Sequence, residues 1–339
     1  MINLLNFNRV SLRDFFVELG EKPFRGDQML KWIYHEYLTD FSQMNNLSQK
    51  LRDYLSKNTI VSAPKIVKEQ VSTDGVIKWL LQLDDGELIE TVFIPEKTRG
   101  TLCISSQVGC AMGCKFCATG KLGFKRNLTT AEIIGQVWLV RQLRYKVTNV
   151  VVMGMGEPLL NIDNMLPALD LMMEDLACGL SKYRVTVSTV GIVPLMDKLF
   201  KASDASLAVS LHAPNDEIRE KLIPMNQHYP IADIIAACKR FFENKKRKVI
   251  IEYVMLDKIN DQKKHAKELV RLLEGVPCKV NLIPFNASPG FSYQASDDET
   301  IRAFQDVLMK AGVRTMQRRR RGADIQAACG QLAGNSRNI

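Results

Sequence analysis

From about residue 100 onward the sequence alternates between short apolar segments and longer amphipathic ones, and this alternation constrains the fold most. Short apolar strands separated by helices are typical of parallel β/α units. The pattern predicts strands at residues 101–106, 149–154, 184–189, 206–211, 248–256 and 279–285, with a last helix at 297–312 and a β-like stretch after it. Six units suit an α/β fold with an open, partial barrel better than a closed barrel of eight.

Two further regions precede the barrel. Residues 1–60 contain SLRDFFVEL and QMLKWIYHEYL, whose helical apolar spacing predicts a small helical domain with Ser11 as an N-cap. This unit is either an RNA-binding domain or a simple helical cap. Within residues 61–98, VIKWLLQL and ELIETVFIP flank a DDG turn and predict a β-hairpin extension. Residues 99–339 then form the barrel and a C-terminal segment.

The charge of the chain is basic, with 46 Lys and Arg against 37 Asp and Glu, a net charge of +9. Residues 310–339 hold seven basic residues and one acidic residue, including Arg318 to Arg321. Such a run is usually a solvated face, although beside a cysteine it could also attract RNA phosphates and favour a thiolate. Neither a membrane span nor a signal peptide is recognisable, so we expect a cytoplasmic protein with reduced cysteines.

Three of the eight cysteines, Cys110, Cys114 and Cys117, form a C-x3-C-x2-C motif directly after the first barrel strand. Three thiolates on one loop bind a soft metal, as zinc or as an iron–sulfur cluster. Structural zinc usually takes four ligands in two pairs, and there is no second C-x2-C motif. A four-iron cluster held by three cysteines would leave one iron open. The other cysteines at 178, 238 and 278 have apolar neighbours and are expected in the core.

Polar residues also follow several predicted strands, where chemistry is concentrated in barrels of this kind. The second strand runs into GMGEP, in which Gly156 would let the backbone approach a ligand and Glu157 could accept hydrogen bonds from an ammonium group. Later strands end at Ser188, Ser210, Leu211, His212 and Asn286. Each of these is more often structural when taken alone, and only their shared position makes them candidates.

The cysteine spacing, with Phe116 before the last cysteine and a partial barrel behind it, resembles the radical S-adenosylmethionine (SAM) enzymes. The resemblance implies a [4Fe-4S] cluster whose open iron is chelated by the amino and carboxylate groups of SAM. One-electron reduction would then release a 5′-deoxyadenosyl radical. On this reading Gly156 and Glu157 match the motif that holds the methionyl amine, and the other strand-end residues become candidate SAM contacts.

A more specific resemblance rests on motifs spread over essentially the whole chain. They are KPFRGDQMLKWIY, IETVFIP, TLCISSQVGCAMGCKFCATG, GMGEPLLN, VSTVG, SLHAPN, LIPFN and AACGQLAGN. Together they resemble the bacterial RNA adenine-C2 methyltransferases of the RlmN family, whose nearest relatives are the C8-specific Cfr enzymes. The resemblance implies methylation of adenine-2503 in 23S rRNA and of adenine-37 in tRNA. It also implies a monomer that uses two SAM molecules per turnover and an electron donor such as flavodoxin.

The same resemblance assigns chemical roles to three residues. Cys329, in AACGQLAGN, would carry the methyl group as S-methylcysteine and form a covalent adduct with the RNA. Glu90, in IETVFIP, matches the acceptor of the adenine C2 proton. Cys103 matches the cysteine that forms a disulfide with Cys329 and releases the product. Without the resemblance, Glu90 would be taken for an exposed strand carboxylate and Cys103 for a buried strand residue.

Three alternatives remain open at this point. The first is a C8-specific, Cfr-like methyltransferase, because no single residue has a derivable effect on the choice of carbon. The second is a radical SAM enzyme that acts on a small molecule or a peptide. The third is a zinc-loop RNA-binding protein without enzymatic activity.

Overall fold

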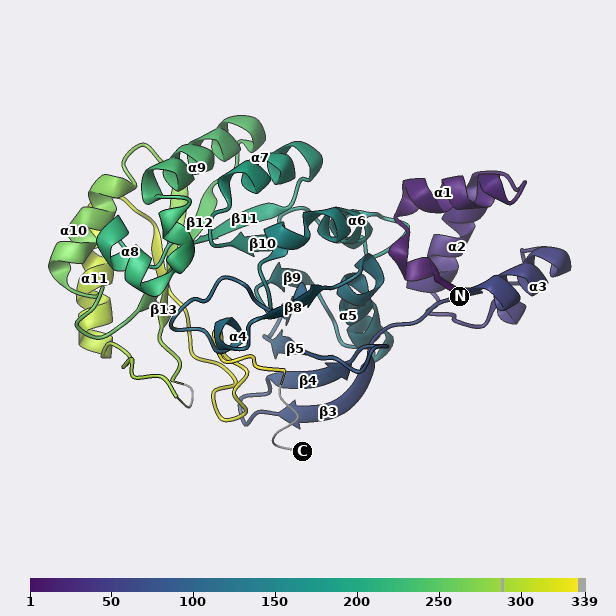
Figure 1. Ribbon diagram of the computed structural model, residues 1–339, viewed down its shortest axis with the longest axis horizontal. Coiled ribbons are helices and arrows are strands. Elements are labelled where there is room, and N and C mark those ends of the chain that lie inside the picture. The colour runs from purple at the N-terminus through teal and green to yellow at the C-terminus, as the bar shows by residue number, and fades with distance from the viewer. Residues whose placement is uncertain (288–289, 335–339) are drawn as a thin grey trace.

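The computed structural model describes residues 1–287 and 290–334, which form a curved sheet wrapped by helices, with three N-terminal helices at one end (Figure 1). Asn335 of the AACGQLAGN motif and Arg337 of the basic C-terminal run lie outside the described residues. Within the described ranges, no helix is both long and apolar enough to cross a membrane.

The main sheet has ten strands in the order β14-β13-β12-β11-β10-β9-β6-β5-β4-β3, counted over the described residues. Its parallel part comprises β6 (Gly100–Cys103), β9 (Asn149–Val152), β10 (Val185–Thr189), β11 (Ser206–Ser210), β12 (Val249–Met255), β13 (Cys278–Pro284) and β14 (Thr315–Gln317). The six predicted barrel strands are therefore confirmed, and the β-like stretch after the last helix adds a seventh. Because β14 and β3 are unpaired edges, the sheet curves without closing, as expected of a partial barrel.

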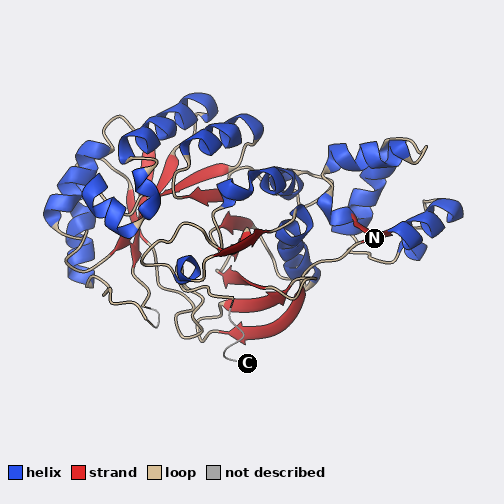
Figure 2. Ribbon diagram, in the orientation of Figure 1, coloured by secondary structure: helices blue, strands red, loops and turns tan. Residues whose placement is uncertain are grey.

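Helices cover the outer face of the parallel strands (Figure 2). They are α5 (Thr130–Gln142), α6 (Ile162–Met173), α7 (Val193–Ala202), α8 (Asp216–Leu222), α9 (Ile231–Lys245), α10 (Lys263–Leu272) and α11 (Asp298–Lys310), while the short α4 (Ala118–Lys121) follows the cysteine motif. Their apolar sides are buried against the sheet, as Leu269 and Phe304 illustrate. The cysteines at 178, 238 and 278 are buried, as predicted.

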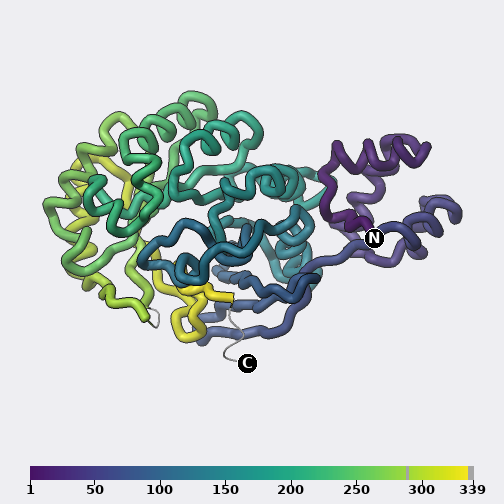
Figure 3. The backbone as a smooth tube through the Cα atoms, in the orientation of Figure 1, coloured from purple at the N-terminus to yellow at the C-terminus, as the bar shows by residue number. Residues whose placement is uncertain are grey.

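The N-terminal unit contains α1 (Arg9–Glu18), α2 (Phe24–Tyr34) and α3 (Gln49–Asn58), with β1 (Ile2–Asn3) paired to β2 (Thr59–Ile60). The tube in Figure 3 shows this unit projecting from one end of the barrel. The predicted N-cap at Ser11 is wrong: the Asn8 side chain caps α1 by accepting the Ser11 amide at 3.0 Å. Asparagine and serine are both good caps, and Ser11 lies inside the first turn.

Three antiparallel strands extend the sheet beyond β6: β3 (Lys65–Val71), β4 (Ile77–Gln82) and β5 (Leu88–Pro95). The predicted hairpin is confirmed as β4–β5, and its turn contains Gly86 at φ +86°. Strand β3 was not predicted, because its apolar residues Ile66, Val67 and Val71 do not alternate regularly with its charged and polar ones. A separate pair, β7 (Gln107–Gly109) and β8 (Phe124–Asn127), flanks the cysteine motif.

Candidate active site

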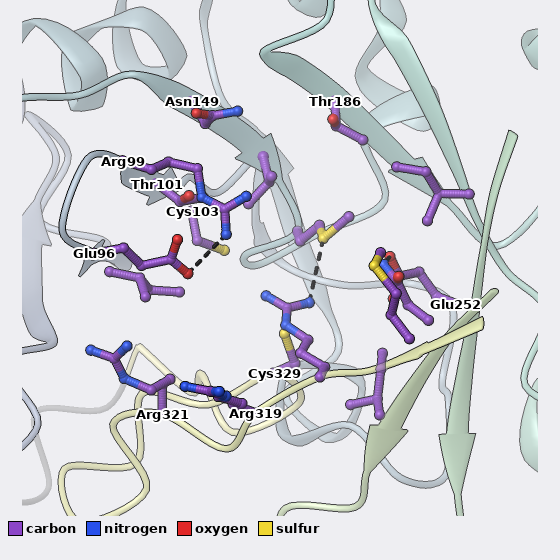
Figure 4. Close-up of a pocket in the computed structure, with 18 of the residues that line it drawn as sticks. Glu96, Arg99, Thr101, Cys103, Asn149, Thr186, Glu252, Arg319, Arg321 and Cys329 are labelled. Carbon is purple, nitrogen blue, oxygen red and sulfur yellow. Dashed lines mark hydrogen bonds and ion pairs between the residues drawn. The ribbon is translucent and has the colours of Figure 1, made fainter. Parts of the chain in front are cut away.

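The curved sheet encloses a cavity of about 1180 Å3. Strand residues that point inward line it, among them Cys103 on β6, Glu252 on β12 and Asn281 on β13. The C-terminal segment supplies further lining residues, including Arg318 and Cys329. Cys103 and Cys329 face the cavity from one side and Glu252 faces it from the other (Figure 4). Residues from distant parts of the chain therefore line the same cavity.

Cys103 and Cys329 are free thiols that influence one another in this cavity. Burial, together with a smaller effect of the Cys329 sulfur, raises the pKa of Cys103 to about 12, while Arg318 acts in the opposite direction. The Cys329 sulfur also contributes to the raised pKa of Cys117, which burial mainly causes. Cys329 therefore lies within electrostatic reach of Cys103 and of the cysteine motif.

Hydrogen bonds hold the segment that carries Cys329 in this position. The Thr119 hydroxyl, two residues after the last motif cysteine, donates to the Leu332 carbonyl at 2.6 Å. The Asn286 amide donates to the Cys329 carbonyl at 3.2 Å. Asn286, a predicted SAM contact, is thus seen positioning the Cys329 segment, and its contact with SAM stays a prediction.

The cysteine motif forms one loop between β7 and α4, and we call residues 110–117 the cysteine loop. Burial raises the pKa of Cys110 to about 12 and raises the pKa of Cys114 well above its usual value. The sulfurs of the loop also act on one another, since Cys117 raises the pKa of both neighbours. Three thiolates at this buried place therefore need a strongly positive group among them, as a bound metal cluster provides.

Among the described residues, no three His, Cys, Asp or Glu side chains are placed so that they could hold a single metal ion. The choice between zinc and an iron–sulfur cluster therefore rests on the chemistry of the donor set, which is three cysteines on one loop with no second C-x2-C pair in the sequence.

Glu157 places a buried carboxylate beside the cysteine loop. Its two oxygens accept the Leu159 amide at 3.1 Å and the Val190 amide at 2.9 Å, and burial raises its pKa to about 7. In turn Glu157 raises the pKa of Cys110. A carboxylate in this position suits the ammonium group of SAM, whose charge would compensate its burial.

The neighbouring glycine has a role beyond the one expected. A Cβ atom on Gly156 would lie 2.6 Å from the Gln107 Cβ, and the residue has φ +101°. Glycine here makes room for the Gln107 side chain, whose Oε1 accepts the Glu157 amide at 2.8 Å. Gly156 thus fixes Glu157 against β7, and the space beside it is filled by protein.

Three of the predicted strand-end residues meet at the carboxyl ends of β10 and β11. The hydroxyls of Ser188 and Ser210 lie 3.4 Å apart, and the Leu211 side chain is fully buried. Arg219 of α8, which the sequence analysis missed, is completely buried and donates to the carbonyls of Leu211, at 3.1 Å, and Ser210, at 3.3 Å. Because it sits in the charged stretch DEIREKL, nothing in the sequence distinguishes it from an exposed helical arginine.

His212 links this rim to the cysteine loop. Its Nδ1 accepts the Val254 amide at 3.0 Å, and its ring packs edge-on against Phe116 with centroids 4.8 Å apart. Burial lowers the pKa of His212 to about 3, so the imidazole is neutral at neutral pH. The residue also adopts a left-handed conformation with φ +60°. Through these contacts, the His212 side chain packs between β12 and the cysteine loop.

Glu90 is buried on β5 and is not the exposed carboxylate that its sequence context alone would favour. One oxygen pairs with the Lys78 ammonium at 2.9 Å. The other accepts the amides of Ala333 at 2.7 Å and Gly334 at 3.2 Å. Since side chains two apart on a strand share a face, Glu90 faces the same side as Val92, which lines the cavity.

The four consecutive arginines do not act as one basic patch. Arg318 lines the cavity close to Cys329, and Arg321 pairs with Asp74 at 2.8 Å. Arg319 and Arg320 are exposed at the cavity wall and form no ion pair with any residue in the described ranges. Of the four, these two are therefore the ones that solvent and an external phosphate can reach directly.

Comparisons with known proteins agree with this arrangement. The N-terminal domain model of large-subunit ribosomal RNA methyltransferases matches residues 2–61, and the radical SAM superfamily model matches residues 104–270. The dual-specificity RNA methyltransferase RlmN of Marinobacter nauticus is 51% identical over 342 residues, covering 98% of this chain and 93% of that protein. The crystal structure of a radical SAM methyltransferase from Sphaerobacter thermophilus has a TM-score of 0.92 at 39% identity, covering 99% of this chain and 100% of that one.

Proposed function

The chain belongs to the RlmN family of RNA methyltransferases, and from that membership we propose that it methylates carbon 2 of adenine in 23S rRNA and tRNA. The observation that carries the proposal is the meeting of Cys103 and Cys329 in one cavity, with Cys329 also within electrostatic reach of Cys117 in the cysteine loop. A carbon without a useful lone pair cannot attack a methyl sulfonium directly. A protein-bound methyl group next to a radical source, with a second thiol for release, is what such a substrate requires.

The radical SAM family uses a [4Fe-4S] cluster and SAM, and we assign the cluster to Cys110, Cys114 and Cys117. When bound, the cluster and SAM supply a radical that can remove a hydrogen atom from a methyl group. Glu157 would bind the SAM ammonium from its buried position beside Cys110. We further propose two SAM molecules per turnover, one as methyl donor and one as radical source.

The protein residues then act in a fixed order. The Cys329 thiolate takes the methyl group of SAM, and after hydrogen removal the carbon on its sulfur bonds to adenine C2. Glu90 accepts the C2 proton, which requires the amides at residues 333–334 to release its second oxygen first. As this proton leaves, the adduct also gives up its unpaired electron, which the bound cluster would accept. The Cys103 thiolate then attacks the Cys329 sulfur: an S–S bond forms, the bond from that sulfur to the transferred carbon breaks, and the carbon takes up a proton, which frees the methylated base.

The remaining expectations complete the proposal. Residues 1–60 would act as an accessory domain that contacts RNA, residues 61–98 as an extension, and residues 99–339 as the catalytic barrel. The enzyme would work in the cytoplasm as a monomer and receive electrons from a donor such as flavodoxin. The exposed arginines at 319 and 320 support an RNA contact next to the cavity.

Mass spectrometry of the RNA product tests this function directly. The anaerobically reconstituted protein is incubated with SAM, a reductant and either a 23S rRNA fragment or tRNA. We expect 2-methyladenosine to accumulate in both RNAs. Accumulation of 8-methyladenosine would instead support the Cfr-like alternative, and the absence of any methylated base would contradict the proposal.

A further inference from the structure

The cavity contains a charged group whose bonding is incomplete. Glu252, on β12, is 3% exposed, and its Oε1 accepts the Asn281 side-chain amide at 2.9 Å. The other oxygen, Oε2, is buried and has no hydrogen-bond partner among the described residues. Burial raises the pKa of Glu252. A buried acceptor without a partner is costly, so a ligand that donates a hydrogen bond here would be stabilised.

A cation lies near this carboxylate without pairing to it. Arg318 and Glu252 both line the cavity, and within the described residues they form no ion pair at 4.0 Å or less. The Cys329 sulfur raises the pKa of Arg318 most, followed by Glu252 and Cys103. The Arg318 guanidinium makes a long contact of 3.9 Å to the Met153 sulfur. Arg318 thus lies near both Cys329 and the Glu252 carboxylate, and its guanidinium has N–H groups left to donate to a ligand.

Resting on the proposed function, we propose that Glu252 and Arg318 form the subsite that recognises the target adenine of the RNA. Along one edge of adenine, carbon 2 is followed by N1, an acceptor, and by the 6-amino group, a donor. With carbon 2 at Cys329, the Arg318 guanidinium donates to N1 and Oε2 of Glu252 accepts the 6-amino hydrogen. Enzymes that act on an extruded base read this edge in the same way. The cavity, at about 1180 Å3, is large enough for a nucleotide.

The Asn281 contact makes the subsite testable by one isosteric change. In Glu252→Gln, the amide oxygen must stay toward Asn281, which donates, so the NH2 group points into the cavity. The variant therefore presents a donor where the wild type presents an acceptor. In adenine, the 6-amino group is also a donor, so two donors would face each other and the contact would be unfavourable. Purine lacks the amino group and avoids this contact.

The experiment compares two RNA hairpins that differ only in carrying adenine or purine at the target position. Both the equilibrium affinity and kcat/KM for methylation are measured with the reconstituted enzyme. For the wild type we expect adenine to be favoured by about 10- to 100-fold, the range for a hydrogen bond to a charged group. For Glu252→Gln we expect the purine hairpin to match or exceed the adenine hairpin in affinity and in kcat/KM.

Glu268→Gln is the matched control. The Glu268 carboxylate also accepts an asparagine amide, from Asn215 at 2.7 Å, but it lies outside the cavity. This variant should keep the wild-type ratio of adenine to purine.

Each other outcome has a distinct meaning. An adenine-to-purine ratio that is the same in Glu252→Gln and wild type overturns the subsite, even when the enzyme methylates adenine normally. SAM also contains an adenine, so equilibrium dialysis with SAM is run in parallel; weaker SAM binding in the variant with an unchanged RNA ratio would place Glu252 at the cofactor and also refute the proposal. A wild type that methylates no adenine would refute the proposed function itself.

Discussion

Among single residues, Cys329 is central to the proposed methyl transfer; it is partly exposed and faces the cavity. Its sulfur lies within electrostatic reach of the Arg318 guanidinium. Because Cys329 does not belong to the cysteine loop, it should carry the methyl group without holding the cluster. The two roles can therefore be separated by mutation.

Replacing Cys329 by Ala should abolish RNA methylation while leaving the iron and sulfide content unchanged, because the three loop cysteines are intact. Iron analysis and mass spectrometry of the RNA check both parts. Cys278→Ala, at the buried start of β13, is the matched control and should retain activity. Methylation by the Cys329 variant, or loss of its iron, would show that the roles are wrongly assigned.

The residues that could be predicted are those whose identity and spacing are themselves unusual. The cysteine loop has the unusual spacing C-x3-C-x2-C, and Cys329 lies in the family motif AACGQLAGN. Arg219 and Glu252 are different, since a single charged residue in a helix or strand pattern does not show whether the fold buries it. Gly156 was predicted to let a ligand approach the backbone, which stays a prediction, and only the structure shows that Gln107 packs beside it.

At the scale of elements, the turn between β3 and β4 holds the start of the C-terminal segment. Asp74 in this turn accepts Arg321 Nε at 2.8 Å and the Gly322 amide at 3.1 Å. From the other side, the Ser72 hydroxyl donates to Asp324 at 2.6 Å. The antiparallel extension therefore positions the segment that carries Cys329, a function that its sequence pattern did not indicate.

This turn gives a prediction about pH. Burial opposes ionisation, yet hydrogen bonds from Ser72, Gly322 and Val76 lower the pKa of Asp74 to about 2, from 3.8. A carboxylate with a lowered pKa stabilises the fold above its ordinary pKa, and this stabilisation is lost as the pH falls from about 4 through 2. Asp74→Asn should thus cost about 1 kcal/mol at pH 7, allowing for partial exposure.

Urea unfolding of the metal-free chain at several pH values measures this effect, and the difference from wild type should shrink as the pH falls toward 2. Asp163→Asn is the control, because its ion pair with Lys198 is largely exposed and should contribute little. A difference for Asp74→Asn that stays constant with pH would show that its ionisation does not stabilise the turn.

The alternation of strands and helices was predictable because burial on both faces makes parallel strands short and apolar. The edge strand β3 escaped prediction because its exposed residues carry no such pattern. The cap of α1 was misplaced by three residues, since Asn8 and Ser11 are both good caps and local sequence does not choose between them.

At the scale of the whole molecule, basic residues line the cavity at both ends of its strands. Arg247, Lys248, Lys279 and Arg314 lie near the amino ends of β12, β13 and β14. Arg319 and Arg320 follow the carboxyl end of β14 and are exposed. This exposed pair would therefore draw a phosphate backbone toward the carboxyl ends of the strands, where the reactive cysteines lie.

Removing the two exposed charges in Arg319→Gln/Arg320→Gln should weaken RNA binding and its dependence on salt. Each lost phosphate contact reduces the slope of log K against log salt by about 0.7 to 0.9. Fluorescence anisotropy of labelled tRNA over a range of KCl concentrations gives the slope. The double variant Arg271→Gln/Arg302→Gln removes exposed charges from α10 and α11 on the outer layer and should keep the wild-type slope. Equal slopes in all three proteins would place the RNA elsewhere.

The central claim is that Cys329 joins the RNA covalently and that Cys103, which lines the same cavity, releases it. Trapping this link in Cys103→Ala tests the claim most directly, with denaturing gel electrophoresis of labelled tRNA after reaction under reducing, anaerobic conditions. We expect a stable protein–RNA adduct in Cys103→Ala and none in Cys103→Ala/Cys329→Ala. Free 2-methyladenosine formed over many turnovers by Cys103→Ala, with no adduct, would contradict the account.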